Sequence, residues 1–408
     1  MVAEEPALAK RRLILRDSIS FAGLLFGTGM LFVITLFLFR SFSTRRAVLA
    51  QDWSSEGLRD LRAGRADAAI IDLRTALAYS PGTRAYELLL AQALGQADCS
   101  GCRDESYNYY MSLWEAQPGD GPINLALARL AAGRKDRQTA INFYRASIYG
   151  TWEGNGVDRR ADVRLELAQY LIENNDLPAA RLELLTAGTN APDNFERDRK
   201  LGEMLQQTGD PVDAWTYDQK AVSDKPTDTA ALRAAANLAY HSGDFEAAHR
   251  LFTREIAVLD AGHVSSDPDA AEQRTMARNA ERIVALDPSS TQSPRERLAR
   301  ILAARTIAGK RFDQCSANFS AENPLPAPLE PIDARWVGPA SALTSTALLR
   351  DPIQQTATMQ LIFDTEIETA KLCTAPTGDD NLLLVLATSP HNVLAHAERQ
   401  ASTLVPLD

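Results

Sequence analysis

The sequence lacks the excess of positive charge that nucleic-acid-binding proteins carry. Its 43 lysine and arginine residues are outnumbered by 53 aspartate and glutamate residues, so the formal net charge at pH 7 is −10. Nucleic-acid binding draws largely on contacts between basic side chains and phosphates. We therefore predict that nucleic acids are not among the partners of this protein.

Sequence motifs of catalytic chemistry are missing as well. The five histidines form no His-Glu-x-x-His pair, and the chain contains neither a Gly-x-Ser-x-Gly turn nor a Walker phosphate loop. Asp364, Glu366 and Glu368 form a cluster of acids. Residues 364 and 368 lie one turn apart on a predicted exposed helix face, so we interpret the cluster as a solvated face rather than as a general acid and base. We predict a protein that is not an enzyme, with no catalytic residues, no cofactor and no metal ion.

Cysteine is scarce, and its placement bears on the compartment. Cys99 and Cys102 form a Cys-x-x-Cys, whereas Cys315 and Cys373 are far apart in the sequence. A structural zinc site usually draws on two close pairs, and a thioredoxin-type Cys-x-x-Cys follows a strand, whereas this one lies between two predicted helices. Two disulfides, Cys99–Cys102 and Cys315–Cys373, are the economical interpretation, and they would require an oxidising compartment. Free buried thiols, a metal site and redox chemistry remain alternatives.

One uncharged run, residues 18–39, is long enough to cross about 30 Å of hydrocarbon as a helix. Arg16 precedes it and Arg40 ends it. A cleaved signal peptide is the rival interpretation, but the run exceeds the usual length and no small-x-small site follows it directly. We predict a short tail over 1–17 and a transmembrane helix over 18–40.

The orientation of this helix is less clearly encoded, because four basic residues precede it and three follow it. A long following domain can be translocated despite its charges, so we expect the N-terminus inside the cytoplasmic membrane and the rest of the chain outside it. Ser20, Gly23 and Gly27 place small residues on one helix face, which could bring two helices together as a homodimer. Glycine is also common in membrane helices without such a role.

A pattern repeated at a spacing of 34 residues organises the middle of the chain. Asn175, Gly209 and Gly243 stand 34 residues apart, and an aspartate follows each. A residue able to adopt positive φ, followed by an Asp N-cap and an amphipathic run, is how one helix ends and the next begins. Small residues recur at fixed distances before and after these turns: Ala168, Gly202, Ala236, Ala180, Ala214 and Ala248.

Helix–turn–helix units with this period resemble the tetratricopeptide repeat (TPR) family. The same pattern of large and small residues occurs earlier in the chain, from Trp53 to Pro81 and in a later unit that includes Tyr144. The unit between them has a stretched turn around Cys99 between its two predicted helices. We predict an all-α fold, namely a TPR-like solenoid over 41–310 behind an N-terminal transmembrane helix. A further helix from Pro294 is expected to end before Gly309.

The remaining segment, 311–408, departs from the repeat pattern. Four prolines between Asn323 and Pro331 exclude a helix there and indicate an extended strap. Helices are expected at about 340–350 and 352–373, and Leu382–Leu386 could be a helix or a strand. Because a repeat array needs its last apolar face covered, we predict that 311–408 is an atypical helical cap.

In the TPR family the first helix of each repeat lines a concave groove, and this resemblance implies partner-binding positions in two repeats. They are Glu196, Arg199, Glu203, Gln206 and Gln207 in one repeat, and Arg233, Asn237, Tyr240 and His241 in the next. These side chains are polar, and Arg233 with Asn237 could hold a peptide carboxylate. They could also be ordinary solvated residues.

The sequence as a whole favours a membrane-tethered scaffold that binds proteins or peptides, in envelope assembly or secretion. One alternative is an enzyme or redox accessory whose active part is 311–408, with the repeats as a recruitment arm. Another is an adaptor that faces the cytoplasm.

Overall fold

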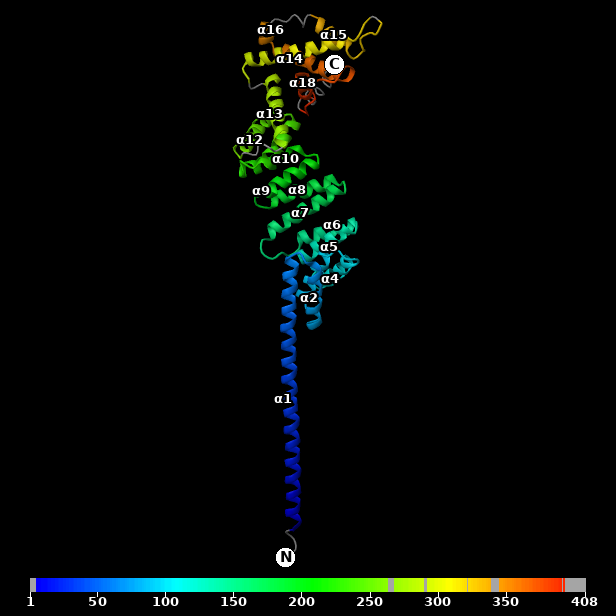
Figure 1. Cartoon of the computed structure of the whole chain (residues 1–408), viewed down its shortest axis with the longest axis vertical. Coiled ribbons are helices and arrows are strands. Elements are labelled where there is room, and N and C mark those ends of the chain that lie inside the picture. The colour runs from blue at the N-terminus through cyan, green and yellow to red at the C-terminus, as the bar shows by residue number, and fades with distance from the viewer. Residues whose placement is uncertain are drawn as a thin grey trace, which may run out of the picture. The chain divides into compact units, whose positions relative to one another are not determined.

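The computed structural model describes residues 5–262, 268–289, 292–320, 322–338, 345–390 and 392. Over these residues the secondary structure is helical, apart from one isolated bridge between Asp120 and Thr151 (Figure 1). The predicted all-α solenoid fold is confirmed. The chain divides into two units, Met1–Tyr170 and Leu171–Asp408, and each is described by itself.

In the first unit, helix α1 runs from Glu5 to Arg62 without a break, so the apolar stretch and the first repeat helix are one element. The helix has no break at residue 40, where the sequence pattern placed the end of the transmembrane helix. Gly57 does not interrupt the helix; it lets α2 (Ala66–Tyr79) approach, because a Cβ there would meet Leu73 Cγ at 2.7 Å. The helix ends where Gly64 adopts a φ of +73°.

The rest of the first unit consists of helical hairpins. They are formed by α3 (Arg84–Gln96) with α4 (Cys102–Ala116), and by α5 (Gly121–Gly133) with α6 (Arg137–Tyr149). Helix α7 (Gly156–Glu173) spans the division between the units. The predicted turn around Cys99 does separate two helices.

The second unit begins with the regular hairpins. Its helices are α8 (Leu177–Asn190), α9 (Phe195–Gln207), α10 (Pro211–Asp224), α11 (Thr229–Ser242) and α12 (Phe245–Ala261). The predicted turn residues Asn175, Gly209 and Gly243 have φ of 56°, 77° and 86°. Ala214 is fully buried, as are Ala180 and Ala248, which is the close helix pairing that the repeated small residues predicted.

The C-terminal helices of this unit are α13 (Pro268–Leu286), α14 (Pro294–Ser316), α15 (Glu330–Val337), α16 (Ser345–Arg350), α17 (Pro352–Leu372) and α18 (Asp379–Ala387). Helix α14 passes through Gly309, so the expectation that it ends there was wrong. The predicted boundary at residue 310 therefore falls inside a helix. Leu382–Leu386 belongs to a helix rather than a strand.

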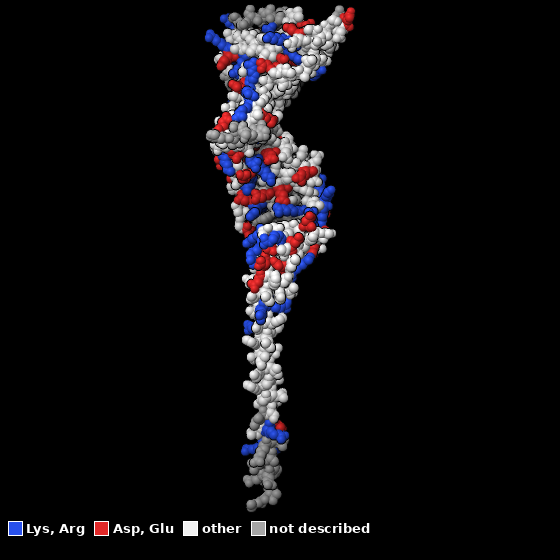
Figure 2. All heavy atoms as spheres, in the orientation of Figure 1, with Lys and Arg blue, Asp and Glu red and all other residues white. Residues whose placement is uncertain are grey.

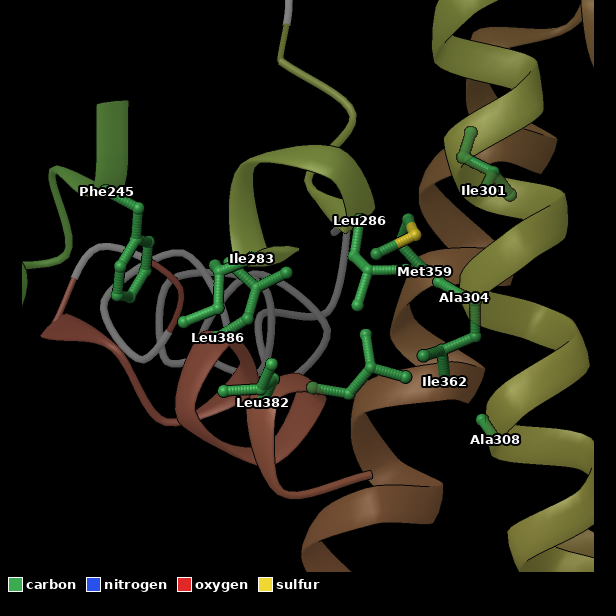
Figure 3. Close-up of a cluster of buried hydrophobic side chains, with 11 residues drawn as sticks. Phe245, Ile283, Leu286, Ile301, Ala304, Ala308, Met359, Ile362, Leu382 and Leu386 are labelled. Carbon is green, nitrogen blue, oxygen red and sulfur yellow. The ribbon is translucent and has the colours of Figure 1, made fainter. Parts of the chain in front are cut away.

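Side chains of four C-terminal helices meet in one core, which Phe245 at the start of α12 also enters (Figure 3). Ile283 comes from α13, Ile301 from α14, Ile362 from α17 and Leu386 from α18. Each such side chain stabilises the fold by roughly 1.5–3 kcal/mol when fully buried. The core thus joins the last hairpin to the helical cap.

Candidate functional site

The α9 face, defined as Glu196, Arg199, Glu203, Gln206 and Gln207, lies on the surface of the second unit. Four of these side chains are exposed and Arg199 is half-buried. The opposite side of the helix is fixed in the core, because Leu201 and Leu205 are fully buried. The helix therefore presents polar groups from a rigid support.

Some side chains of the α9 face already have partners within the chain. Arg199 lies 3.8 Å from Glu196, and Lys225 lies 3.5 Å from the same carboxylate. Exposed pairs at such distances are weak. Glu203 and Gln207, one turn apart and both exposed, have no hydrogen-bond or ion-pair partner among the described residues. These two side chains are the ones most available to a ligand.

Gln206 is tied to a buried carboxylate that the sequence pattern did not predict. Its side-chain amide donates to Asp218 Oδ2 at 3.2 Å, and Asp218 is 2% exposed. Burial raises the pKa of the Asp218 carboxyl to about 7, the hydrogen bond from Gln206 lowers it, and Glu203 raises it. A Cβ at position 202 would collide with this carboxylate, which explains the glycine there. The repeated small residue at position 202 was visible in the sequence, but its polar neighbour was not.

The α11 positions, defined as Arg233, Asn237, Tyr240 and His241, are less open than the α9 face. The Nε of Arg233 donates to Glu255 Oε1 of α12 at 2.8 Å, and Glu255 is fully buried. An arginine that neutralises a buried carboxylate is a structural ion pair, since removing it would leave an uncompensated charge. This arrangement disfavours Arg233 as a clamp for a peptide carboxylate.

Tyr240 packs inward rather than lining a groove. Its ring meets Phe245 edge-on with centroids 5.2 Å apart, and it borders the apolar cores of the second unit. His241 is exposed, and its ring centroid lies 5.9 Å from that of Tyr240. Asn237 is half-buried. Of the α11 positions, His241 and Asn237 are therefore the ones that a ligand could reach.

The four cysteines form two close pairs. The Cα atoms are 5.4 Å apart for Cys99 and Cys102, and 5.8 Å apart for Cys315 and Cys373. Both separations lie in the range of disulfides. Cys315 is 2% exposed, near the end of α14, and Cys373 directly follows α17. The described residues contain no group of three or more His, Cys, Asp or Glu placed to hold a metal ion.

A buried arginine and a buried glutamate accompany the second cysteine pair. Arg311 donates to the Thr369 carbonyl at 3.3 Å and to the Thr374 carbonyl, so it ties α14 to the end of α17. Glu366 is fully buried, and neither carboxylate oxygen has a hydrogen-bond partner. Its interpretation as part of a solvated face was wrong, because position 366 lies on the opposite side of the helix from 364 and 368.

Burial raises the pKa of the Glu366 carboxyl to about 8, and the Asp380 carboxyl also raises it, whereas the Arg311 guanidinium lowers it. The same part of the chain holds a cavity of about 410 Å³. Its polar lining includes Asp287, Arg297 and Gln355. If residues 311–408 carried an enzymatic or redox activity, as the alternative interpretation holds, this cavity would be the candidate site.

The apolar part of α1 is accessible along its whole length. One described helix, Ile14–Arg62, is long and apolar enough to cross a membrane, with a mean hydropathy of 2.2 in its most apolar window and none of that window buried. Figure 2 shows this stretch of α1 as an uncharged surface between charged residues. Ser20, Gly23 and Gly27 lie on it, and a Cβ at either glycine would meet nothing within 4 Å.

Of the comparisons with known proteins, the one with solved structures found alignments. No family model and no curated protein matches the chain. Among solved structures, PilF of Pseudomonas aeruginosa aligns with a TM-score of 0.40 and 13% identity, covering 56% of this chain and 98% of that one. PilW, a type IV pilus biogenesis factor, aligns with a TM-score of 0.40 and 15% identity, covering 53% and 95%. The C-terminal part of a TPR repeat-containing protein from Cytophaga hutchinsonii aligns with a TM-score of 0.43 and 11% identity, covering 78% and 97%.

The chain is a helical solenoid that resembles TPR proteins. The three alignments, at TM-scores of 0.40 to 0.43, carry no argument about fold, partner or compartment. The resemblance rests on the hairpins themselves, whose turns recur every 34 residues with positive φ.

Proposed function

We propose that this protein is a membrane-tethered scaffold that binds a partner protein or peptide through the α9 face and the reachable α11 positions. The observation that carries the proposal is the pair Glu203 and Gln207, which are exposed, one turn apart and without partners among the described residues. A carboxylate and an amide at this spacing suit the backbone amides and basic side chains of an extended segment. The rigid helix beneath them lowers the entropic cost of binding.

Site-specific photocrosslinking tests this surface. A benzophenone amino acid at position 203 or 207 of the full chain, activated in cells, is expected to give a discrete adduct with a partner. The matched control is position 182, because Leu182 is 65% exposed on α8 but lies outside the proposed surface. Adducts of equal yield at all three positions, or none at 203 and 207, would contradict the proposal.

The tether in this proposal is the apolar part of α1, with the repeats outside the cytoplasmic membrane in envelope assembly or secretion. Because α1 continues unbroken into the first repeat, the repeat domain would start directly at the membrane rather than on a flexible linker. The two close cysteine pairs support an oxidising compartment.

A fusion of alkaline phosphatase after Asp408 tests the sidedness, since that enzyme needs an oxidising compartment. We expect an active phosphatase. An inactive phosphatase together with a fluorescent cytoplasmic reporter at the same position would instead support an adaptor that faces the cytoplasm.

Self-association through Ser20, Gly23 and Gly27 is the second part of the tether proposal. Small residues at this spacing permit close helix approach. Replacing both glycines by leucine should convert a dimer of the intact protein in detergent to a monomer in light scattering. An unchanged mass would reject this contact.

A further inference from the structure

A second candidate surface of the repeats includes no residue of α9. A cavity of about 600 Å³ opens between α10 and α12, the second helices of two consecutive hairpins, with Ala235 of α11 in its lining. Val222 and Leu251 give it apolar walls, and Gln219 and Ser223 place an amide and a hydroxyl at its exposed rim. Its size suits one or two side chains of a ligand.

Trp215 is the aromatic residue of this cavity and is held in place by packing. It borders the buried cluster around Phe252 and also the cluster around Leu232, so its ring is positioned before any ligand arrives. Its indole N–H has no hydrogen-bond partner within the described part of the chain, whereas the indole N–H groups of Trp152 and Trp336 both donate. Tryptophan in a partly desolvated pocket is the residue type that most often carries binding energy at protein interfaces.

Two arginines stand beside this cavity without carboxylate partners. Arg250 and Arg254 are one turn apart on α12, both are exposed, and both line the cavity. No ion pair or hydrogen bond joins either side chain to another described residue. Like charges at this spacing disfavour a helix, so a bound anion would relieve a repulsion that the free protein carries.

Several basic side chains of the neighbouring hairpins, by contrast, do contact carboxylates. Arg181 contacts Asp210 and Asp213, Lys220 contacts Asp193 at 2.9 Å, and Arg274 contacts Asp260 at 2.5 Å. In a chain with a net charge of −10, carboxylates are plentiful. Two adjacent guanidinium groups that pair with none of them, next to an apolar cavity, are complementary to an acidic ligand with an apolar group.

We propose that this cavity binds an acidic peptide segment of a partner protein. One apolar side chain of that segment inserts between Trp215 and Leu251, and flanking carboxylates accept hydrogen bonds from Arg250 and Arg254. Guanidinium groups bind carboxylates with two parallel hydrogen bonds, which adds geometric specificity to the contact. The rim amide of Gln219 and the hydroxyl of Ser223 suit the backbone of an extended peptide. This second docking surface is independent of the α9 face.

Fluorescence anisotropy with the full chain in detergent micelles tests the proposal. The probe is a fluorescein-labelled peptide, Gly-Ser-Asp-Glu-Phe-Glu-Asp-Ser-Gly. Two comparison peptides replace the acids by their amides or the phenylalanine by serine. We expect each comparison peptide to bind at least tenfold more weakly than the probe.

Charge reversal identifies the residues. The variant Arg250→Glu with Arg254→Glu should lose at least tenfold in affinity for the acidic probe and should bind a lysine version of it more tightly than the wild type does. The control Arg103→Glu with Arg145→Glu changes the net charge equally at exposed positions and should leave probe binding unchanged. Ser223→Trp, at the exposed rim, should block the cavity without touching the arginines.

Several results would overturn the proposal. One is equal binding of the acidic and amide peptides. Another is undiminished probe binding by both the charge-reversed variant and Ser223→Trp, provided that their circular dichroism spectra show intact folds. Loss of binding to phosphatidylglycerol vesicles in the charge-reversed variant, without peptide binding by the wild type, would assign the arginines to a membrane surface. Loss of self-association in that variant would assign them to a second copy of the chain. Charge changes in the α9 face should leave probe binding unaltered, so the two proposed surfaces can fail separately.

Discussion

Replacing Glu366 by glutamine should make the protein less sensitive to pH. Glu366 is fully buried, its carboxylate oxygens have no hydrogen-bond partner, and burial raises its pKa to about 8 from an ordinary value of 4.5. Between these two values the folded chain holds a proton that the unfolded chain has released. The contribution of Glu366 to the free energy of unfolding is therefore most favourable below pH 4.5 and falls as the pH rises through this window.

The size of the effect follows from a single proton. The slope is about 1.4 kcal/mol per pH unit, so the wild type should lose about 2 kcal/mol relative to Glu366→Gln between pH 6 and pH 7.5. Asp218, whose pKa is raised to about 7, adds a slope of the same sign to both proteins and cancels from the comparison.

Urea unfolding of both proteins at several pH values, followed by tryptophan fluorescence and circular dichroism, measures this difference. Trp336 stacks on Phe312 and donates to Thr365, next to Glu366, so the fluorescence reports on this part of the cap. The control Glu368→Gln removes a partly exposed carboxylate paired with Lys371 and should not reproduce the trend. A difference in unfolding free energy between wild type and Glu366→Gln that stays constant from pH 6 to 7.5 would show that this carboxyl does not titrate in that range.

Two further predictions concern packing and crosslinking. Ala214→Trp should destabilise the solenoid by roughly 1–3 kcal/mol because Ala214 is fully buried. The control Val212→Trp, at a position 75% exposed on the same helix, should change the unfolding midpoint little. Equal midpoints for the two variants would reject the close helix pairing. Cys315 and Cys373 should be joined in protein isolated without reductant, and reduction should cost up to about 4 kcal/mol in the chain-entropy model. Thiol counting and peptide mapping check this, and two alkylatable cysteines at these positions would reject the crosslink.

The hairpins were predicted correctly because the residues that end one helix and begin the next lie close together in the sequence. A turn residue with positive φ at 175, 209 and 243 and an aspartate directly after it specify where one helix ends and the next begins, whatever the helices pack against. The Asp210 side chain accepts from the Asp213 amide, as an N-cap should.

The errors arose where packing outweighed local preference. Gly309 could end a helix, but α14 packs against α17 on both sides of it and continues to Ser316. Glycine in a helix costs only about 1 kcal/mol relative to alanine, which such packing offsets. The α1 helix also contains a glycine, Gly57, where Leu73 of α2 packs close to the backbone.

The candidate surfaces were only partly visible for the same reason. The repeat spacing identified exposed polar positions on α9. It could not reveal that Arg233 of α11 pairs with a buried carboxylate 22 residues later. Nor could it show that Trp215 and the arginines at 250 and 254 share a cavity, because these residues come from different hairpins.

Quantitative affinity purification tests the proposal that the α9 face recruits a partner protein. The intact protein would be compared with Glu203→Lys combined with Gln207→Ala, and with Leu182→Lys combined with Val212→Lys as a control of equal charge change at exposed positions. We expect one or a few proteins to co-purify with the wild type and the control. Their recovery should fall at least about tenfold with the α9 variant, which would correspond to a loss of about 1.4 kcal/mol or more in binding free energy. Recovery of the same proteins in the same amounts with all three would contradict it.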